Sequence, residues 1–172
     1  MSPRVYVSFP ISEDMGTLNS VVAKINQSKA TADFWDRGTY YNKKMSDYDA
    51  VVIVMPKNGF SVHGSGIPNG VKLEIASAIR SNTKLFLAYR ASNGMNIYDA
   101  QVQVNNNNIL HFSGVGGTSH VFHEFIEKRQ KSEEMKQTSG TTVQKPVWEE
   151  STVKKIENRV EVLQYDERLL LF

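Results

Sequence analysis

The chain has 172 residues, of which 40% are hydrophobic, and a formal net charge of +2 at pH 7. This length and composition indicate one globular domain, and the weak charge without a long basic run does not indicate nucleic-acid binding. Cysteine is absent, which excludes disulfides, thiolate zinc ligands and cysteine nucleophiles. The sequence has no signal-peptide pattern and no apolar stretch of roughly 20 residues, so we expect a cytoplasmic protein without a membrane partner.

The first half of the chain alternates between strand and helix patterns. A β-branched and aromatic run predicts a strand over residues 4–9. Apolar residues then recur at helical spacing over 12–28, where Ser12 is a plausible N-cap. A short second strand is expected within 31–38, and the continuous apolar run over 50–55 is typical of a central parallel strand.

The second half continues this alternation. Its expected elements are a helix over 71–81, strands over 84–90 and 109–114, and a closing helix over 115–135. The polar stretch 91–108 is expected to connect the two strands. The pattern predicts an α/β fold, a flavodoxin/Rossmann-like three-layer sandwich with a mainly parallel five-stranded sheet. In such sheets, ligands bind beyond the carboxyl ends of the strands.

The composition changes near residue 130. Residues 1–130 are expected to form the α/β domain, and residues 131–148, which are poor in large apolar side chains, to form a linker. Residues 149–172 show the 3–4–3 apolar spacing of an amphipathic helix and end in the apolar sequence "RLLLF". Because an exposed apolar tail tends to be covered, we expect this segment to make the protein a homo-oligomer.

Glu74 is the carboxylate to which the sequence draws attention. It follows a loop rich in glycine and serine and lies just inside a predicted helix, within "GSGIPNGVKLE". A carboxylate can attack the anomeric carbon of a nucleoside or stabilise the oxocarbenium-like species formed when the base leaves. Glycines let a sugar or phosphate approach the backbone at a helix start. The alternative is a first-turn acid that only suits the helix dipole.

Three short motifs resemble the nucleoside 2-deoxyribosyltransferase superfamily, including its 2'-deoxynucleoside 5'-monophosphate N-glycosidases. They are "DAVV" at 49–52, "GVKLEIASA" at 70–78 and the strand "KLFLAYR" at 84–90. The opening "VYVSFPIS" is similar to the first strand and loop of the family, where an aromatic and small polar residues face the sugar. Elements match in order over residues 4–130, and motif-level identity is confined to about 45 residues.

The resemblance implies a set of site residues and no cofactor or metal. Glu74 would be the nucleophile or the oxocarbenium stabiliser. The family has a second acid upstream of the "DAVV" strand, where this chain has "YYNKK". Asp36 and Asp47 are the nearby substitutes, and Asp36 is taken as the catalytic one. The substrate-binding set contains residues of the first strand, the second motif and the loop between them: Tyr6, Ser8, Phe9, Asp49, Ser61, Ser65, Gly66, Asn69 and Gly70. The implied partner is a nucleoside or nucleotide, whose 5'-phosphate Ser61 and Ser65 would bind.

Two other functions remain open from the sequence. "VSFPISED" loosely resembles the opening of TIR domains, and "SDYDAVVIVMPKNGFS" resembles their third strand and the loop after it. TIR domains also place a glutamate at the start of the helix after the third strand. That resemblance implies a module that binds a nucleotide or an ADP-ribose-type ligand. The third possibility is an assembly protein that acts through its C-terminal tail.

Two features at the start of the closing helix bear on ligand binding. His120 and His123 are spaced i, i+3, but no third ligand has suitable spacing, so surface or capping histidines are expected instead of a metal site. The sequence "SGVGGTS" at 113–119 precedes the same helix and lacks the lysine of a P-loop. It is a weak indication that the helix start holds an anion.

Overall fold

The computed structural model describes residues 2–9, 15–35, 43–55, 69–91, 94–104, 110–114 and 120–139. The elements, in chain order, are β1 (Arg4–Ser8), α1 (Met15–Gln27), β2 (Thr31–Asp33), a 3₁₀ turn (Met45–Asp47), β3 (Ala50–Val54), α2 (Asn69–Arg80), β4 (Lys84–Ala91), β5 (Gly94–Val104), β6 (Leu110–Gly114) and α3 (His120–Ser139). The predicted N-cap Ser12 lies outside the described residues, as does the tail 149–172, so oligomerisation through that tail stays a prediction.

The strands form one six-stranded sheet in the order β2-β1-β3-β4-β5-β6. The pairs β1–β2, β1–β3 and β3–β4 are parallel, whereas β4–β5 and β5–β6 are antiparallel. The α/β class and the mostly parallel sheet are therefore confirmed, and the sheet has one strand more than the five expected. The order of the first five strands is the 2-1-3-4-5 order of flavodoxin-like sheets, with the difference that the fifth strand here is antiparallel.

β5 is the strand that the sequence pattern missed. It occupies most of the stretch expected to be a polar connection, and it pairs with β4 from Ala91↔Gly94 to Phe86↔Asp99. The period-two alternation of a strand is present, because Met95 and Ile97 are buried against the core. The composition conceals the strand, because asparagines and glutamines make the stretch polar on average. Gly94 has φ +111°, a conformation that glycine adopts without strain at the start of the strand.

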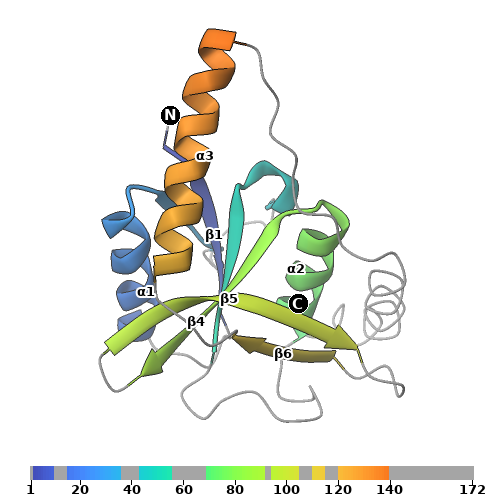
Figure 1. Cartoon of the computed structure of the whole chain (residues 1–172). Coiled ribbons are helices and arrows are strands. Elements are labelled where there is room, and N and C mark those ends of the chain that lie inside the picture. Colours follow the sequence, from blue (N-terminus) through green and yellow to red (C-terminus); the bar gives the residue numbers. More distant parts are fainter. Residues whose placement is uncertain are drawn as a thin grey trace.

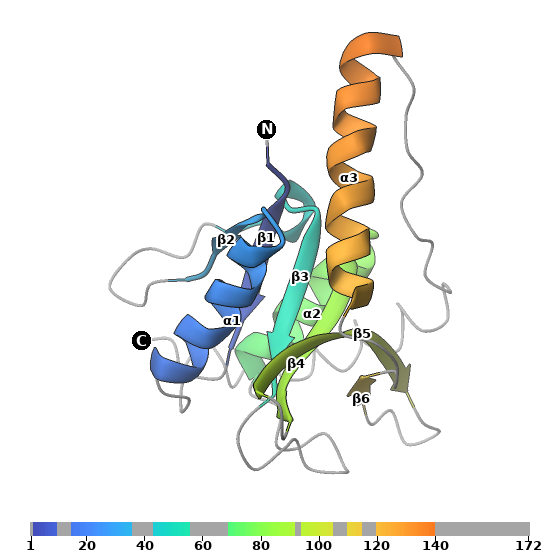
Figure 2. The same cartoon turned by 60° about the vertical axis from the view of Figure 1, so that its left-hand side comes forward.

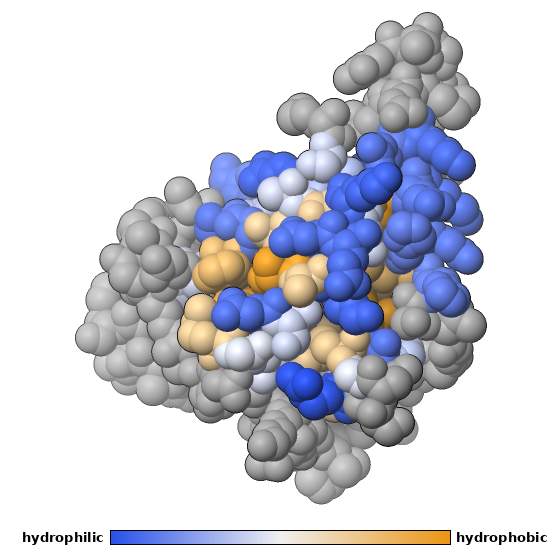
Figure 3. Space-filling view, turned by 90° about the vertical axis from the view of Figure 1, so that its left-hand side faces the viewer, coloured by the Kyte–Doolittle hydropathy of each residue, from blue (hydrophilic) through white to orange (hydrophobic). Residues whose placement is uncertain are grey.

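Helices cover both faces of the sheet, in three layers (Figures 1 and 2). α2 packs on one face, against a cluster that includes Tyr6, Ile53 and Leu87. α1 and α3 pack on the other face, against a cluster that includes Val7 and Phe86. Alternate residues of β1 thus enter different layers, as the pleat of a strand requires. Seen from the α1 side, hydrophilic side chains surround a small apolar centre (Figure 3).

α3 is longer than the sequence pattern indicates. It runs to Ser139, so residues 131–139 are helical although their composition predicts a linker. Its last turns extend beyond the end of the sheet (Figure 1), which explains the scarcity of large apolar residues there. Within the described residues, no helix combines the length and the apolar character needed to cross a membrane.

A polar cluster ties the end of β2 to the segment before β3. The Asp33 carboxylate accepts hydrogen bonds from the Tyr48 hydroxyl at 2.5 Å and from Lys43 Nζ at 3.0 Å. Burial alone would raise the pKa of Asp33, but the bonds from Tyr48 and Lys43, the charge of Lys43 and the Phe34 N–H outweigh it and lower that pKa. Burial and the neighbouring carboxylate raise the pKa of Tyr48, so its hydroxyl stays protonated as the donor.

Replacing Tyr48 by phenylalanine is expected to reduce the pH-dependent contribution of Asp33 to the free energy of unfolding. Folding lowers the pKa of Asp33. Asp33 therefore adds to the free energy of unfolding at pH values above its unfolded pKa of about 3.9, and this contribution is lost as the pH falls through its folded pKa. Tyr48→Phe should lower the free energy of unfolding by about 1 kcal/mol near neutral pH, and the difference should shrink below pH of about 4. Urea unfolding over a pH series measures this. Tyr98→Phe, which removes a hydroxyl remote from carboxylates of this cluster, should show no such acid dependence, and an equal trend in both variants would contradict the assignment.

Candidate functional site

The described part of the sheet has a topological switch point between β1 and β3. The chain leaves β1 towards β2 on one side, and it leaves β3 towards β4 on the other. In open α/β sheets, the loops that follow two such strands diverge, and ligands bind in the crevice between them at the carboxyl ends. Ser8 is the last residue of β1 and pairs with Ile53 near the end of β3. Ser8 therefore stands at the place where this architecture puts a ligand.

Ser8 and Glu74 meet at this switch point. Ser8 Oγ donates a hydrogen bond to Glu74 Oε1 at 2.8 Å, although the two residues are 66 positions apart in the chain. Ser8 is 1% exposed, and Glu74 is half-buried. The contact follows from packing: Val71 and Ile75 anchor α2 on the sheet, and Glu74 lies three positions after Val71, on the same side of the helix. The structure thus brings together two of the predicted site residues.

Glu74 is not a first-turn acid. α2 begins at Asn69, so Glu74 is in the second turn, and the first turn contains no acid. The helix dipole acts mainly on the first turn, so it accounts less well for a carboxylate here than a first-turn position would have done. Ser8, predicted to contact substrate, instead holds one carboxylate oxygen of Glu74. Because hydrogen-bonded carboxylates keep one orientation, Ser8 is a positioning residue for Glu74.

The two aromatic candidates of β1 are not equivalent. Tyr6 is on the same face as Ser8 but is 1% exposed and packs against Tyr48, with ring centroids 5.2 Å apart. Phe9 is half-buried against the α1 side of the sheet and contacts Phe34 edge-on at 6.3 Å. Tyr6 therefore lies in the core behind the site, and the Phe9 ring packs on the opposite face from Glu74. The structure brings neither ring to the carboxylate as a surface for a sugar.

Asp49 lies at the amino end of β3, the end away from Ser8. Its Oδ1 accepts hydrogen bonds from Nε and Nη2 of Arg129 at 3.0 and 2.7 Å, and its Oδ2 accepts one from the Arg4 N–H at 2.8 Å. The two charged side chains are only about one-fifth exposed, at 20% for Asp49 and 18% for Arg129. Asp49 therefore ties β1, β3 and α3 together, and the structure does not bring it to Glu74.

Replacing Asp49 by asparagine is expected to affect stability and not the site. The amide can still accept from Arg4, but it removes the charge that pairs with Arg129, which should cost about 1–2 kcal/mol in urea unfolding. A double-mutant cycle with Arg129→Gln should show that most of this loss is the interaction energy between the Asp49 and Arg129 side chains. Any activity that depends on Glu74 should be unchanged at a temperature where the variant is folded. A large loss of activity with unchanged stability would return Asp49 to the substrate-binding set.

The remaining candidates are placed only in part. Asn69 and Gly70 begin α2, at the carboxyl edge of the sheet, which is where the sequence places them. Four candidates lie outside the described residues: Asp36, Ser61, Ser65 and Gly66. Their roles stay predictions. Within the described residues, no group of three or more histidine or acidic side chains could hold a metal ion.

A stacked tyrosine pair on the α2 face was not anticipated. The rings of Tyr89 and Tyr98 are 4.4 Å apart and nearly parallel. Burial and a hydrogen bond with Tyr98 raise the pKa of Tyr89, so the Tyr89 hydroxyl stays protonated at neutral pH. Tyr89 is half-buried against the same cluster as α2. The sequence concealed this pair because Tyr98 belongs to β5, the strand whose pattern was obscured.

Comparisons with known proteins add little to the geometry. No protein-family model matches the chain, and no curated protein matches it. One solved structure with some similarity is a heterocyclase in complex with substrate and cofactor, at 10% sequence identity and a TM-score of 0.32. The alignment covers 95% of this chain and 19% of that one. A TM-score this low does not indicate a shared fold or function. The sheet topology defines the class of protein, an α/β protein with a mostly parallel sheet.

Proposed function

We propose that this protein cleaves the N-glycosidic bond of a nucleoside or nucleotide, with Glu74 as the group that meets the anomeric carbon. The observation that supports this most is the 2.8 Å hydrogen bond from Ser8 to Glu74 at the switch point between β1 and β3. It holds a half-buried carboxylate in one orientation at the edge where α/β sheets bind ligands. The resemblance of "DAVV" and "GVKLEIASA" to the deoxyribosyltransferase superfamily points to the same residue.

The reaction asks little more of Glu74 than position and charge. As the bond between the anomeric carbon and the base nitrogen breaks, the base leaves with the electron pair and positive charge develops on the sugar. A carboxylate beside that carbon stabilises the charge or bonds to the carbon to form a glycosyl intermediate. Water then completes a hydrolysis, whereas a second base completes a transfer. The fixed orientation given by Ser8 favours either course, because no reorientation is needed during the reaction.

The departing base also needs a proton, which an acidic side chain must supply. Without such an acid, the site would bind its ligand but not cleave it. Of the acids described near the expected position, Asp33 is bound to Tyr48 and Lys43, and Asp47 is exposed in the 3₁₀ turn. Asp36 is the substitute predicted from sequence, and it lies outside the described residues. If Asp36 does not serve, the same site at the switch point would bind a nucleotide or an ADP-ribose-type ligand without turnover. That binding module is the alternative to the enzyme.

The test is the release of base by the full chain. The protein is incubated separately with the four 2'-deoxynucleoside 5'-monophosphates, the matching nucleosides and NAD, and the products are separated by chromatography. Base released by the wild type but not by Glu74→Gln supports the enzyme. Adding a second base distinguishes transfer, which yields a new nucleoside, from hydrolysis, which yields the sugar. No product with any substrate, together with ligand-dependent thermal stabilisation, would reject catalysis and support the binding module.

A further inference from the structure

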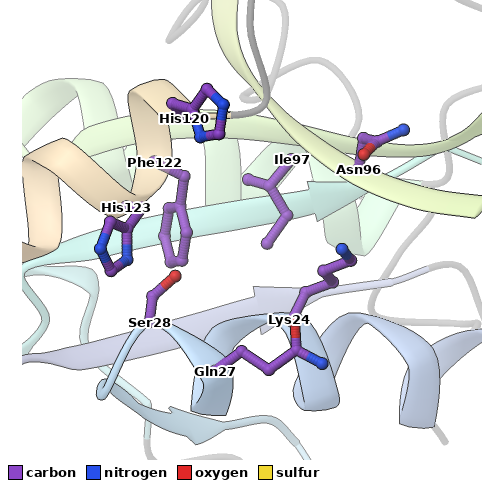
Figure 4. A pocket seen from close by; sticks show the side chains of 8 residues that line it. All are labelled: Lys24, Gln27, Ser28, Asn96, Ile97, His120, Phe122 and His123. Atoms are coloured by element: carbon purple, nitrogen blue, oxygen red, sulfur yellow. The ribbon is translucent and has the colours of Figure 1, made fainter.

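A cavity of about 260 Å³ lies on the face of the sheet opposite Glu74. It opens between the C-terminal end of α1 and the N-terminal end of α3, over β5 (Figure 4). Its lining comes from these three elements and is mostly polar: Lys24, Gln27 and Ser28 from α1 and the residue after it, Asn96 and Ile97 from β5, and His120, Phe122 and His123 from α3. The cavity is separate from the proposed glycosidase site, since Glu74 belongs to the α2 layer on the other face of the sheet.

The cavity has a buried floor and a polar rim. Ser28, Asn96, Ile97 and Phe122 are each at most 8% exposed and form the floor. Lys24, Gln27 and His120 are exposed, and His123 is partly exposed, so these four form the rim. A ligand entering from solvent would therefore pass charged and amide groups first and then reach the floor.

Ser28 is the feature of the floor that indicates a ligand. It is 8% exposed, and among the described residues its hydroxyl has no hydrogen-bond partner, although its backbone N–H bonds to the Ile25 carbonyl. The hydroxyl points into the cavity on the side of Phe122 and His123 (Figure 4). A buried hydroxyl without a partner destabilises the fold by itself. A ligand in the cavity would give that hydroxyl a partner.

The electrostatics of the lining favour an anion. Among the described residues, every titratable side chain that lines the cavity is a lysine or a histidine, and none is a carboxylate. The Lys24 side chain rises towards β5 with its ammonium at the cavity (Figure 4), and among the described residues it forms no ion pair. α3 begins at His120, so the N–H groups of its first turn and its positive dipole end face this side. On α3, the Glu127 carboxylate pairs with His123 Nε2 at 3.0 Å.

The C-terminal end of α1 works against an anion, but only weakly. Its last carbonyls carry a partial negative charge of about half an electron in total. The Ile25 carbonyl accepts from Ser28 and Ala30, and the Asn26 carbonyl accepts from Lys29, so both are already engaged. The full charge of Lys24 and the start of α3 therefore dominate the potential in the cavity.

We propose that this cavity binds a phosphate group, either free phosphate or the phosphate of a small monoester. A water molecule occupies about 30 Å³ in the liquid, so the cavity has room for a phosphate and a few more heavy atoms. Lys24 supplies the charge, Ser28 supplies a donor at the floor, and the first turn of α3 supplies N–H groups. The weak anion signal of the sequence before α3 points to the same helix start.

Isothermal titration of the full chain with inorganic phosphate, at constant ionic strength set with chloride, tests the proposal. Saturable binding is expected, and Lys24→Gln should weaken it about tenfold through loss of a charge-assisted hydrogen bond. Ser28→Ala should also weaken binding several-fold, yet leave the ligand-free protein as stable as the wild type or more stable, because it removes a buried hydroxyl without a partner. A serine with a purely structural role would show the opposite change in stability.

Lys128→Gln is the matched control, because it removes the same charge from an exposed position on α3 that does not line the cavity. It should bind phosphate as the wild type does. Equal weakening by Lys24→Gln and Lys128→Gln would show nonspecific attraction and overturn the proposal, as would the absence of saturable binding at millimolar phosphate. Titration with ribose 5-phosphate distinguishes the two sources: tighter binding than inorganic phosphate assigns a monoester, and equal or weaker binding assigns the free anion.

Discussion

Glu74→Gln is expected to reduce the release of base about a thousandfold, the scale seen when one preorganised electrostatic group is removed from a site. Glutamine keeps the shape of the side chain and can still accept from Ser8, so the fold should be retained. What is lost is the negative charge that stabilises the developing positive charge on the sugar. Initial rates by chromatography, with the free energy of unfolding measured alongside, separate loss of chemistry from loss of structure.

Two further variants sharpen this result. Ser8→Ala leaves the carboxylate in place but removes the donor 2.8 Å from it, so we expect a smaller loss, about tenfold, mainly in kcat. Glu124→Gln neutralises an exposed glutamate on α3 and should leave the rate unchanged. If Glu74→Gln retains more than about a tenth of the wild-type rate, a catalytic role for this carboxylate is excluded.

The largest effect on stability is expected from Phe86→Ala. Phe86 is fully buried in β4, and its ring meets Phe122 and Phe125 of α3 edge-on, at 5.1 and 5.4 Å. Removing the ring takes away the contacts that fix α3 on the sheet and leaves a cavity. We expect the free energy of unfolding to fall by about 4 kcal/mol, as for other large-to-small changes in a core.

Urea unfolding measures this loss, and Phe34→Ala is the comparison. Phe34 is only half-buried, at the edge of the same cluster, so its loss should be about 1–2 kcal/mol. Equal losses in the two variants would mean that α3 is not held on the sheet through Phe86. Phosphate binding in the Phe86→Ala protein should also weaken, because the cavity described above depends on the position of α3.

The elements that the sequence predicted well are those whose residues share one environment. β3 is apolar at every position because helices cover both its faces, so Ala50–Val54 was evident from composition alone. β5 is different: it is polar on average, and only its pairing with β4 shows which residues are buried. The extension of α3 was missed for a related reason, since a helix that projects past the sheet needs no apolar face.

The site was predictable only as separate pieces. Glu74 and Ser8 were both candidates, but their contact joins positions 66 residues apart, and no local pattern reports such a distance. The alternation of side chains along β1 places Ser8 and Phe9 on opposite faces of the sheet, so only Ser8 faces Glu74. Asp49 was assigned to the site through a motif, although it precedes β3 and therefore lies at the amino end. A motif specifies the order of residues, whereas the direction of the strand determines at which end of the sheet a residue lies.

The shortness of β2 affects how copies of this protein can associate. β2 has three residues, Thr31–Asp33, and forms one lateral border of the sheet. The residue at its end, Asp33, carries a charge that is held in place by Tyr48 and Lys43. A border that is this brief and ends in a fixed charge offers few unpaired peptide groups to an incoming strand. Continuous growth of the sheet from molecule to molecule is therefore disfavoured at this border, which protects the protein against strand-mediated aggregation.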